Sequence, residues 1–175
     1  FFVIVTQNPV ETAGTFPLPE AQMDRFMMRL SMGLPSREEE LSILERYMEN
    51  EHLDTLTSVF TLADLEEVKR EAVKVFVHPC VREYMVDIVK ATREGEGMVM
   101  GVSTRGSLCL LRCAKAYACL HGRSFVTPDD VKALAVPVLA HRIIAGYGTE
   151  TPEAAGALVQ KLLFSLPVPT EDFSS

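Results

Sequence analysis

The stretch that decides the fold is "TRGSLCLLRCAKAYACLHG", residues 104–122. Its apolar residues lie on almost every side of a helix, which is typical of a helix surrounded by other helices. Gly122 suits the position just beyond the helix end, because glycine readily adopts the left-handed backbone conformation that is common there. We therefore expect this stretch to form the central helix of a helical bundle.

Several helices are predicted before the central one. Ser36 with Glu39, and Thr61 with Asp64, have the spacing of a capping box, in which two side chains satisfy free amides at a helix start. Residues 81–93 then carry apolar side chains at helical spacing. The sequence upstream of the central helix therefore predicts three helices, two of them with explicit start signals.

Two further helices are predicted after the central one. Thr127 suits a helix cap and precedes a proline and two aspartates, which are favourable in a first turn. Pro137 lies inside this helix and is expected to kink or break it. A last helix is predicted over residues 151–166. We expect a glycine-punctuated loop over residues 93–103 and a frayed tail at the C-terminal end.

The first 34 residues have a different pattern. "FFVIV", residues 1–5, is β-branched and aromatic, which is typical of a strand buried on both faces. Prolines then lead into a short helix over residues 20–25. Apolar side chains at every second position of residues 26–32 predict a second strand.

These patterns divide the chain into three parts. Two strands and one short helix cannot bury a sheet by themselves, so residues 1–34 are expected to be the end of a larger α/β domain. Residues 35–166 are predicted to form a helical domain, and residues 167–175 a tail. The fold class is therefore mainly α: a helical bundle preceded by a strand–helix–strand remnant of an α/β core.

Composition excludes some classes of function. The net charge is −7, which argues against a general nucleic-acid or anionic-membrane binder, because both need a basic surface. No apolar run reaches the roughly 18 residues of a membrane helix. The four cysteines are 80, 109, 113 and 119, and no histidine completes a metal-binding pattern with them. We expect reduced, structural cysteines, no metal site on these residues, and a cytoplasmic protein.

Asn8 and Arg25 are the first two candidate functional residues. Asn8 stands three residues beyond the first predicted strand, and ligands of α/β sheets bind at this end of the strands. Its amide could orient a water molecule or contact a phosphate oxygen, or it could simply form the turn before Pro9. Arg25 could contact phosphate oxygens, since its guanidinium offers a planar fork of donors; the alternative is a surface pair with Asp24.

Arg105 is the third candidate. It lies at the start of the otherwise apolar central helix, where a positive charge opposes the helix dipole. This placement becomes favourable if an anion binds at the same helix end, as phosphates commonly do. The alternative is an arginine that is simply solvated.

The order and spacing of these residues closely resemble the MoxR branch of the AAA+ ATPases. The resemblance extends from Phe1 to about Pro169, and four segments carry it: "TQNPVE" (6–11), "GTFPLPEAQMDRF" (14–26), "LPSREEE" (34–40) and the stretch from "GVSTRG" to "AHRI" (101–143). The segment ending in "DRF" is the most specific of them. Thr104 stands where the family motif often has proline, and threonine also suits a helix start.

The resemblance implies a role for each candidate residue. Asn8 matches sensor 1, which positions the water that attacks the terminal phosphate. Arg25 matches the arginine finger, which is offered to the ATP of a neighbouring subunit. Arg105 matches sensor 2, which reaches from the helical lid to the phosphates. The helical part of the chain matches that lid.

Two family elements are missing from the sequence. It contains no G-x-x-x-x-G-K-[S/T] phosphate loop and no apolar strand that ends in paired carboxylates for magnesium. The resemblance therefore implies the C-terminal part of an ATPase module. ATP and Mg²⁺ would be held mainly by elements outside this sequence, and the chain alone is expected to be inactive.

The resemblance also implies partners. Neighbouring subunits would form a ring, expected to be a hexamer, that uses ATP for chaperone-like remodelling of other proteins. Von Willebrand factor A-domain proteins are among the expected partners. The alternative hypothesis is a helical adaptor that keeps the lid fold without ATP chemistry. A helix-turn-helix DNA binder fits the helices but not the acidic charge balance.

Overall fold

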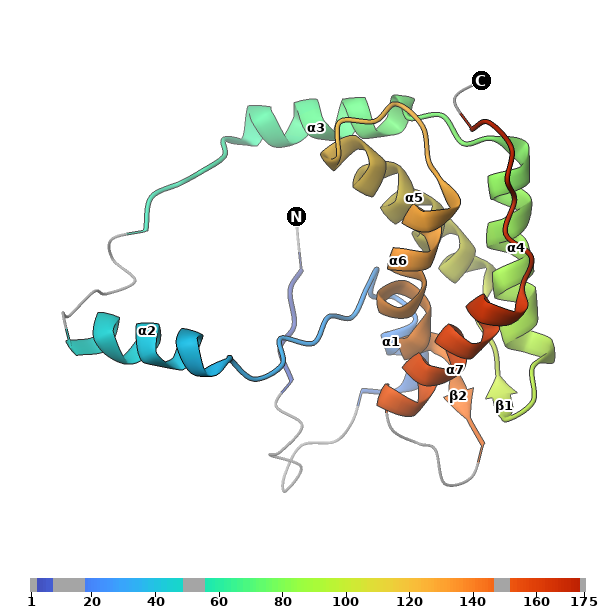
Figure 1. Cartoon of the computed structure of the whole chain (residues 1–175), viewed down its shortest axis with the longest axis horizontal. Helices are drawn as coiled ribbons and strands as arrows, with labels where there is room; N and C mark the ends of the chain where they lie inside the picture. Colours follow the sequence, from blue (N-terminus) through green and yellow to red (C-terminus); the bar gives the residue numbers. More distant parts are fainter. Residues whose placement is uncertain (1–2, 8–17, 49–55, 147–151, 174–175) are drawn as a thin grey trace.

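The computed structural model describes residues 3–7, 18–48, 56–146 and 152–173, and this part of the chain is mainly helical. Its helices follow the predicted order (Figure 1). The elements are α1 (Glu20–Met23), α2 (Arg37–Met48), α3 (Leu62–Lys74), α4 (Pro79–Glu94), β1 (Met98–Met100), α5 (Thr104–Leu120), α6 (Pro128–Leu139), the 3-10 helix η2 (Ala140–Arg142), β2 (Ile144–Ala145) and α7 (Pro152–Ser165). The mainly α fold class is confirmed.

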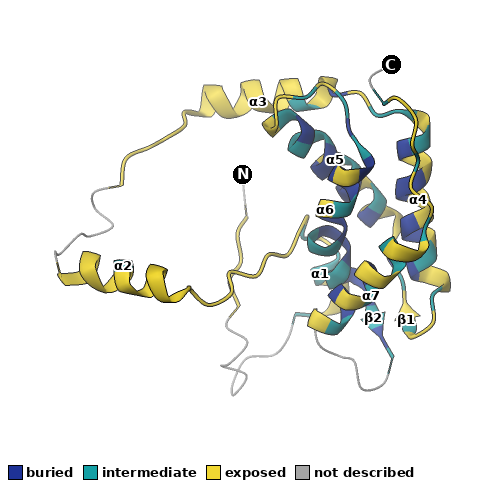
Figure 2. Ribbon diagram, viewed as in Figure 1, coloured by how far each residue is buried: buried dark blue, intermediate teal, exposed yellow. Residues whose placement is uncertain are grey.

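The hydrophobic core lies between α4, α5, α6 and α7, with α5 at its centre as predicted. Figure 2 shows the buried residues of α4, α5 and α6 on the sides that face one another. Side chains from all four helices are fully buried there, among them Val81, Ile88, Leu110, Leu139 and Val159. Removing this much apolar surface from water is the main stabilising contribution to such a bundle.

The predicted helix starts are confirmed. Thr61 and Thr127 each accept a hydrogen bond from the backbone N–H three residues later, and the aspartate at that position bonds back to the cap. At α2, the N–H of Ser36 donates to Glu39 Oε2 at 2.7 Å. Gly122 has a φ of 69°, the left-handed conformation expected just beyond α5.

The loop predicted over residues 93–103 contains a strand. β1 pairs antiparallel with β2, with Met98 opposite Ala145 and Met100 opposite Ile144. Periodicity could not reveal strands this short, because each contributes only two or three residues. The pairing joins the connection between α4 and α5 to the chain that follows η2.

The two strands predicted in the first 34 residues are not formed where the structure describes them, at residues 3–5 and 26–32. A strand needs a neighbour for its backbone hydrogen bonds, and the described residues supply none here. Val3, Ile4 and Val5 remain more than half exposed. These residues have the apolar pattern of strands, but the described part of the chain forms no sheet with them.

Two expectations about the second half are also corrected. Pro137 does not break α6, which continues to Leu139; the proline lies in the last turn, where few residues follow it in the helix. The C-terminal tail is not frayed over its described part. It runs along α4 in Figure 1, and Phe173 packs against the core.

Two features complete the description. α2 stands apart from the bundle in Figure 1 and has no buried residue. Within the described ranges, every helix is too short or too polar to cross a membrane.

Candidate functional site

The C-terminal end of α6 is where the turn after α1 attaches to the bundle. The last carbonyls of any helix lack intrahelical partners and need donors from elsewhere. The carbonyl of Pro137 accepts the backbone N–H of Arg29 at 2.8 Å. The carbonyl of Val138 accepts a hydrogen bond from the guanidinium of Arg142. The chain that carries the "DRF" motif is therefore fixed to the helical bundle at this helix end.

Arg142 makes most of this attachment. Only 1% of its side chain is exposed, and each of its three guanidinium nitrogens donates a hydrogen bond. Its other acceptors lie in the turn after α1 and on α5: Asp24 Oδ1 (3.0 Å), the carbonyls of Asp24 (3.2 Å), Phe26 and Met27 (3.3 Å), and Cys109 Sγ (3.4 Å). A buried charge is tolerated only when it is paired and hydrogen-bonded, and this guanidinium meets both conditions.

Asp24 is shared by three donors. Besides Arg142, its carboxylate accepts the hydroxyl of Ser103 at 3.2 Å and lies 3.6 Å from Nη1 of Arg105. Ser103 is the cap residue of α5, and Arg105 lies in its first turn. An anion therefore does lie at this helix start. Its negative charge offsets the unfavourable interaction of Arg105 with the helix dipole. In this structure the anion is a carboxylate of the same chain.

The close approach of α5 to Arg142 depends on Gly106. A Cβ atom at this position would lie 2.2 Å from Cγ1 of Val102 and 3.2 Å from Cδ of Arg142. Val102 cannot easily give way, because it is 1% exposed and its backbone is held on both sides. Its N–H donates to Thr92 Oγ1 at 3.0 Å, and its carbonyl accepts from Nε of Arg93 at 2.8 Å. The end of α4 thus fixes where α5 begins.

His141 adds a second contact to the same turn. Its Nε2 lies 3.2 Å from the carbonyl of Phe26, so a proton on that nitrogen completes a hydrogen bond. Burial, together with the adjacent positive charge of Arg142, lowers the pKa of His141 to about 4. The imidazole is therefore neutral at pH 7 and acts here as a hydrogen-bond donor.

The structure brings two of the three predicted site residues into one region. Arg105 is half-exposed and contacts Asp24, and Arg25 directly follows Asp24 in the chain. Arg25 itself is exposed, and its side chain has no partner within the described residues. The alternative of an Asp24–Arg25 surface pair is not observed, since Asp24 pairs with Arg105 and Arg142 instead. Asn8 lies outside the described residues.

Sequence reasoning missed Asp24 and Arg142 as site residues. Asp24 was considered only as a partner of Arg25. The signal for Arg142 was its charge at the end of the apolar segment "ALAVPVLAHRI", residues 133–143. A charge that directly follows a buried helix must find a partner or return to water, and this one finds Asp24.

Within the described chain, His78, Cys80 and Glu171 form a group that could hold a metal ion. Nδ1 of His78 is 2.8 Å from Sγ of Cys80 and 3.7 Å from Oε2 of Glu171. Nitrogen and sulfur ligands of one tetrahedral zinc ion lie about 3.6 Å apart, given the usual bond lengths. The observed distance is that of a hydrogen bond, which accounts for the His78–Cys80 contact without a metal.

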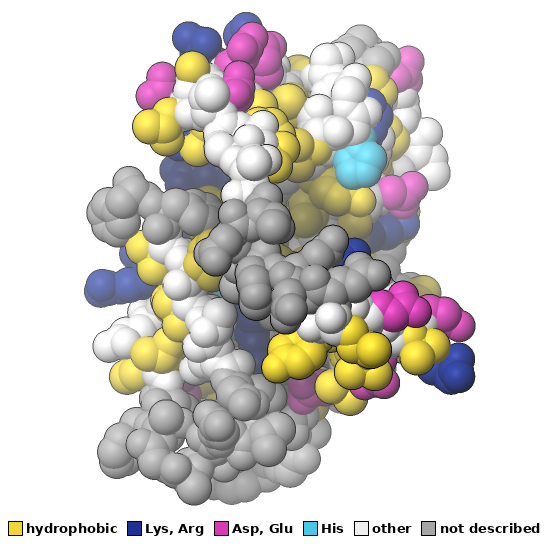
Figure 3. All heavy atoms as spheres, turned by 90° about the vertical axis from the view of Figure 1, so that its left-hand side faces the viewer, with side chains coloured by type: hydrophobic (Ala, Val, Ile, Leu, Met, Phe, Trp, Pro, Cys, Tyr) yellow, Lys and Arg dark blue, Asp and Glu magenta, His cyan; other side chains and the backbone are white. Residues whose placement is uncertain are grey.

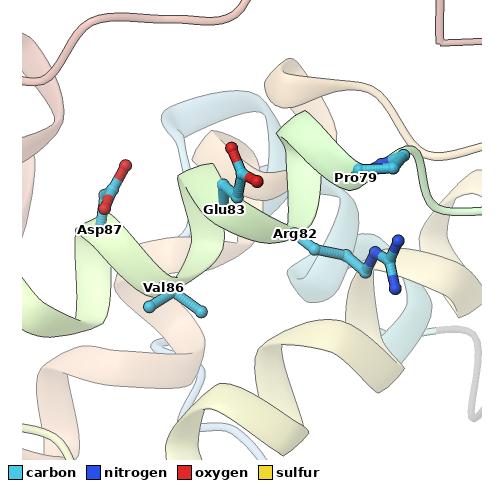
Figure 4. A pocket seen from close by; sticks show the side chains of 5 residues that line it. All are labelled: Pro79, Arg82, Glu83, Val86 and Asp87. Carbon is cyan, nitrogen blue, oxygen red and sulfur yellow. The ribbon is translucent and has the colours of Figure 1, made fainter.

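The surface also carries a shallow hollow on α4. Its lining residues are Pro79, Arg82, Glu83, Val86 and Asp87, and Figure 4 shows that all of them project from this one helix. None of them belongs to the cluster around Asp24. The hollow therefore gives no reason to move the candidate site away from the junction of α1, α5 and α6.

Comparisons with known proteins identify the family of this chain. The AAA lid domain family matches residues 90–162, and the ATPase family associated with various cellular activities (AAA) matches residues 1–28. Chaperone MoxR1 of Mycobacterium tuberculosis is 35% identical over 91% of this chain and 44% of its own length. Protein MoxR of Paracoccus denitrificans is 31% identical over 95% of this chain and 56% of its own length. The chain belongs to the MoxR family of AAA+ ATPases.

Two further relatives define the extent of this MoxR-family chain. The uncharacterized protein YeaC of Bacillus subtilis is 42% identical over 98% of the chain and 54% of its own length. The crystal structure of a candidate ATPase from Cytophaga hutchinsonii superposes with a TM-score of 0.81 at 33% identity, over 94% of this chain and 53% of that one. The MoxR-family chain thus spans about half the length of the relatives that it matches.

Proposed function

We propose that this chain is the sensor and lid portion of a MoxR-type ATPase. Residues 1–34 would be the end of the nucleotide-binding core, residues 35–166 the lid, and residues 167–175 a tail. The intact protein would use ATP and Mg²⁺ in a ring of identical subunits, expected to be a hexamer, to remodel or activate partner proteins. The matched MoxR1 is named a chaperone, which supports this class of function.

The observation that carries the proposal is the meeting of Arg105 and Asp24 at the start of α5. The hydroxyl of Ser103 and the guanidinium of Arg105, both at the start of α5, already hold an anion. Exposed amides and a positive charge at a helix start are also what a phosphate group needs. We therefore assign Arg105 to phosphate contact within the chain's own subunit. A bound nucleotide would supply the phosphoryl group, while this chain supplies the charge that orients it.

Arg25 would act on a different nucleotide. Its side chain is exposed, whereas the carboxylate of the neighbouring Asp24 is bonded to Arg142 of the bundle. An arginine offered to an adjacent subunit must be accessible, and its backbone must be held firmly enough to place it. Asn8 would orient the attacking water, as the family resemblance implies. Mg²⁺ would be bound by carboxylates outside residues 1–175.

The exposed apolar surface agrees with a missing neighbour. Figure 3, which views the molecule from the α2 side, shows several groups of hydrophobic side chains among charged ones. Val3, Ile4, Met32, Leu34 and Tyr47 are each at least half exposed. Groups of large apolar side chains that stay exposed are often buried at an interface with another domain or subunit. We propose that these side chains face the rest of the ATPase core and the adjacent subunit, with von Willebrand factor A-domain proteins among the further partners.

The decisive experiment is Arg25→Ala in the full-length protein. Turnover of ATP should fall by at least a hundredfold, because the finger stabilises charge only during reaction, while nucleotide affinity should change less than threefold. Arg82→Ala on the exposed side of α4 is the matched control and should leave both quantities unchanged. Unchanged turnover in Arg25→Ala would remove the finger assignment. Failure of the full-length protein to bind ATP at all would favour the adaptor alternative.

A further inference from the structure

The turn that carries Arg25 is held by the bundle rather than by its own helix. α1 has only four residues and no buried side chain, so it cannot fix the turn by itself. The backbone of residues 24–29 is bound from the bundle at four points: the carbonyls of Asp24, Phe26 and Met27 accept from Arg142, and the N–H of Arg29 donates to Pro137.

We propose that Arg142 is the positioning residue of the arginine finger: together with Asp24 it clamps the finger turn to the lid, so that the lid sets the direction of Arg25. The proposal rests on the proposed function of Arg25 and goes beyond it, because Arg142 would contact neither the nucleotide nor the neighbouring subunit. It acts only through the backbone on either side of Arg25.

The geometry of the guanidinium makes this role specific. Donors in a planar fork can bind a carboxylate and several carbonyls at the same time, which a single ammonium group cannot do. The 1% exposure of Arg142 keeps water from competing for these acceptors. The acceptors lie both before and after Arg25, at Asp24 and at Phe26, so the turn is held on both sides of the finger.

Arg105, the residue proposed to contact phosphate, is bound to the same carboxylate of Asp24. Arg105 shares the carboxylate of Asp24 with Arg142, yet Arg105 is half-exposed while Arg142 is buried. A phosphate at the start of α5 would compete with Asp24 for Arg105 and leave the contact with Arg142 in place. Occupation of one subunit's own site would thereby change the charge balance beside the finger that it offers to the next subunit.

Hydrogen exchange at the Arg29 amide tests the clamp on this chain directly. That N–H is bonded to Pro137, across the junction, so it is protected only while the turn lies on α6. In Arg142→Met we expect it to exchange at least tenfold faster relative to wild type, with the amides of α5 unchanged. Arg142→Lys should give an intermediate rate, and the exposed control Arg82→Met should match wild type. If Arg142→Met does not fold, Asp24→Ala removes the other half of the clamp and should give the same tenfold increase.

Turnover in the full-length protein separates positioning from mere structure. Arg142→Met should lower kcat at least tenfold while nucleotide affinity changes less than twofold, and Arg142→Lys should recover part of kcat. Unchanged exchange at Arg29, in Arg142→Met or in its substitute Asp24→Ala, overturns the clamp whatever the protein's activity. Faster exchange with unchanged kcat, where Arg25→Ala abolishes turnover, overturns the positioning role and leaves the proposed function intact. If Arg25→Ala keeps its turnover, the proposed function of Arg25 fails, while the exchange result still decides whether the clamp exists.

Discussion

Arg105 Nη1 lies 3.6 Å from Asp24 Oδ2, so the arginine assigned to phosphate contact is already paired with a carboxylate. The pair is accessible, since 54% of the Arg105 side chain and 26% of the Asp24 side chain are exposed. Exposed pairs contribute only up to about 1 kcal/mol, so a phosphate with more negative charge can displace the carboxylate.

We therefore expect Asp24→Asn to raise the nucleotide affinity of the full-length protein about threefold, because the competing anion is removed. Turnover should fall, since the same change weakens the bond to Arg142 that holds the finger turn. Titration with a fluorescent ATP analogue and a steady-state assay would measure the two effects. Asp87→Asn, on the exposed side of α4, is the control. A lower affinity in Asp24→Asn would contradict competition between carboxylate and phosphate.

The capping aspartates of α3 and α6 offer a matched pair for stability. Both close a capping box, but Asp130 is buried and also accepts two hydrogen bonds from Arg123, at 2.6 and 2.5 Å. Burial alone would raise the pKa of Asp130, but the bonds from Arg123 and Thr127 outweigh it and lower the pKa overall.

Asp130→Ala should reduce the free energy of unfolding by about 3 kcal/mol, because it leaves Arg123 and a cap amide without their partner. Asp64→Ala removes only an exposed capping-box contact and should cost clearly less. Urea denaturation of the two variants measures the difference. Equal losses would show that the Arg123–Asp130 pair adds nothing beyond the cap.

Local signals in the sequence were sufficient for the helices but not for the site. The starts of α2 and α3 were predicted from side chains three residues apart, and the start of α6 from a cap residue followed by a proline and two aspartates. Arg25 and Arg105 were predicted because short motifs surround them. The bond from Arg142 to Asp24 joins residues 118 positions apart, and no periodicity or motif links them.

The failed strand predictions have a physical reason of the same kind. A β-strand is defined by the strand beside it, so apolar alternation at residues 26–32 shows what the segment could do rather than what it does. The described residues place part of this segment on α6 through Arg29, whose N–H is bonded to Pro137. Helix signals are local and strand pairing is not, which is why the first 34 residues were the least predictable part of the fold.

Two helical glycines give opposite predictions. A Cβ at Gly106 would lie 2.2 Å from the buried Cγ1 of Val102, whereas a Cβ at Gly156 would lie an ordinary 3.5 Å from Val136 Cγ1. Gly106→Ala should therefore destabilise the chain by about 1–3 kcal/mol through overpacking. Gly156→Ala should stabilise it by about 0.5–1 kcal/mol, because alanine is the better helix former. Thermal unfolding compares the two; stabilisation by both would mean that α5 can move away from Val102 and Arg142.

The lowered pKa of His141 implies that the stability of the folded chain depends on pH. Burial and the charge of Arg142 lower its pKa from 6.5 to about 4 in the folded chain. Between these two pH values the unfolded chain binds a proton that the folded chain does not, so stability falls as the pH decreases through this window.

We expect the free energy of unfolding to fall by about 1–2 kcal/mol between pH 7 and pH 5. Because the imidazole of His141 is partly accessible to solvent, the lower value of this range is expected. His141→Gln can still donate a hydrogen bond to Phe26 but does not titrate, so it should lose most of this slope. His121→Gln, at an exposed histidine, should keep it. Urea titrations at both pH values provide the measurement. A slope that persists in His141→Gln would show that another group carries it, and that His141 is not held neutral by its burial beside Arg142.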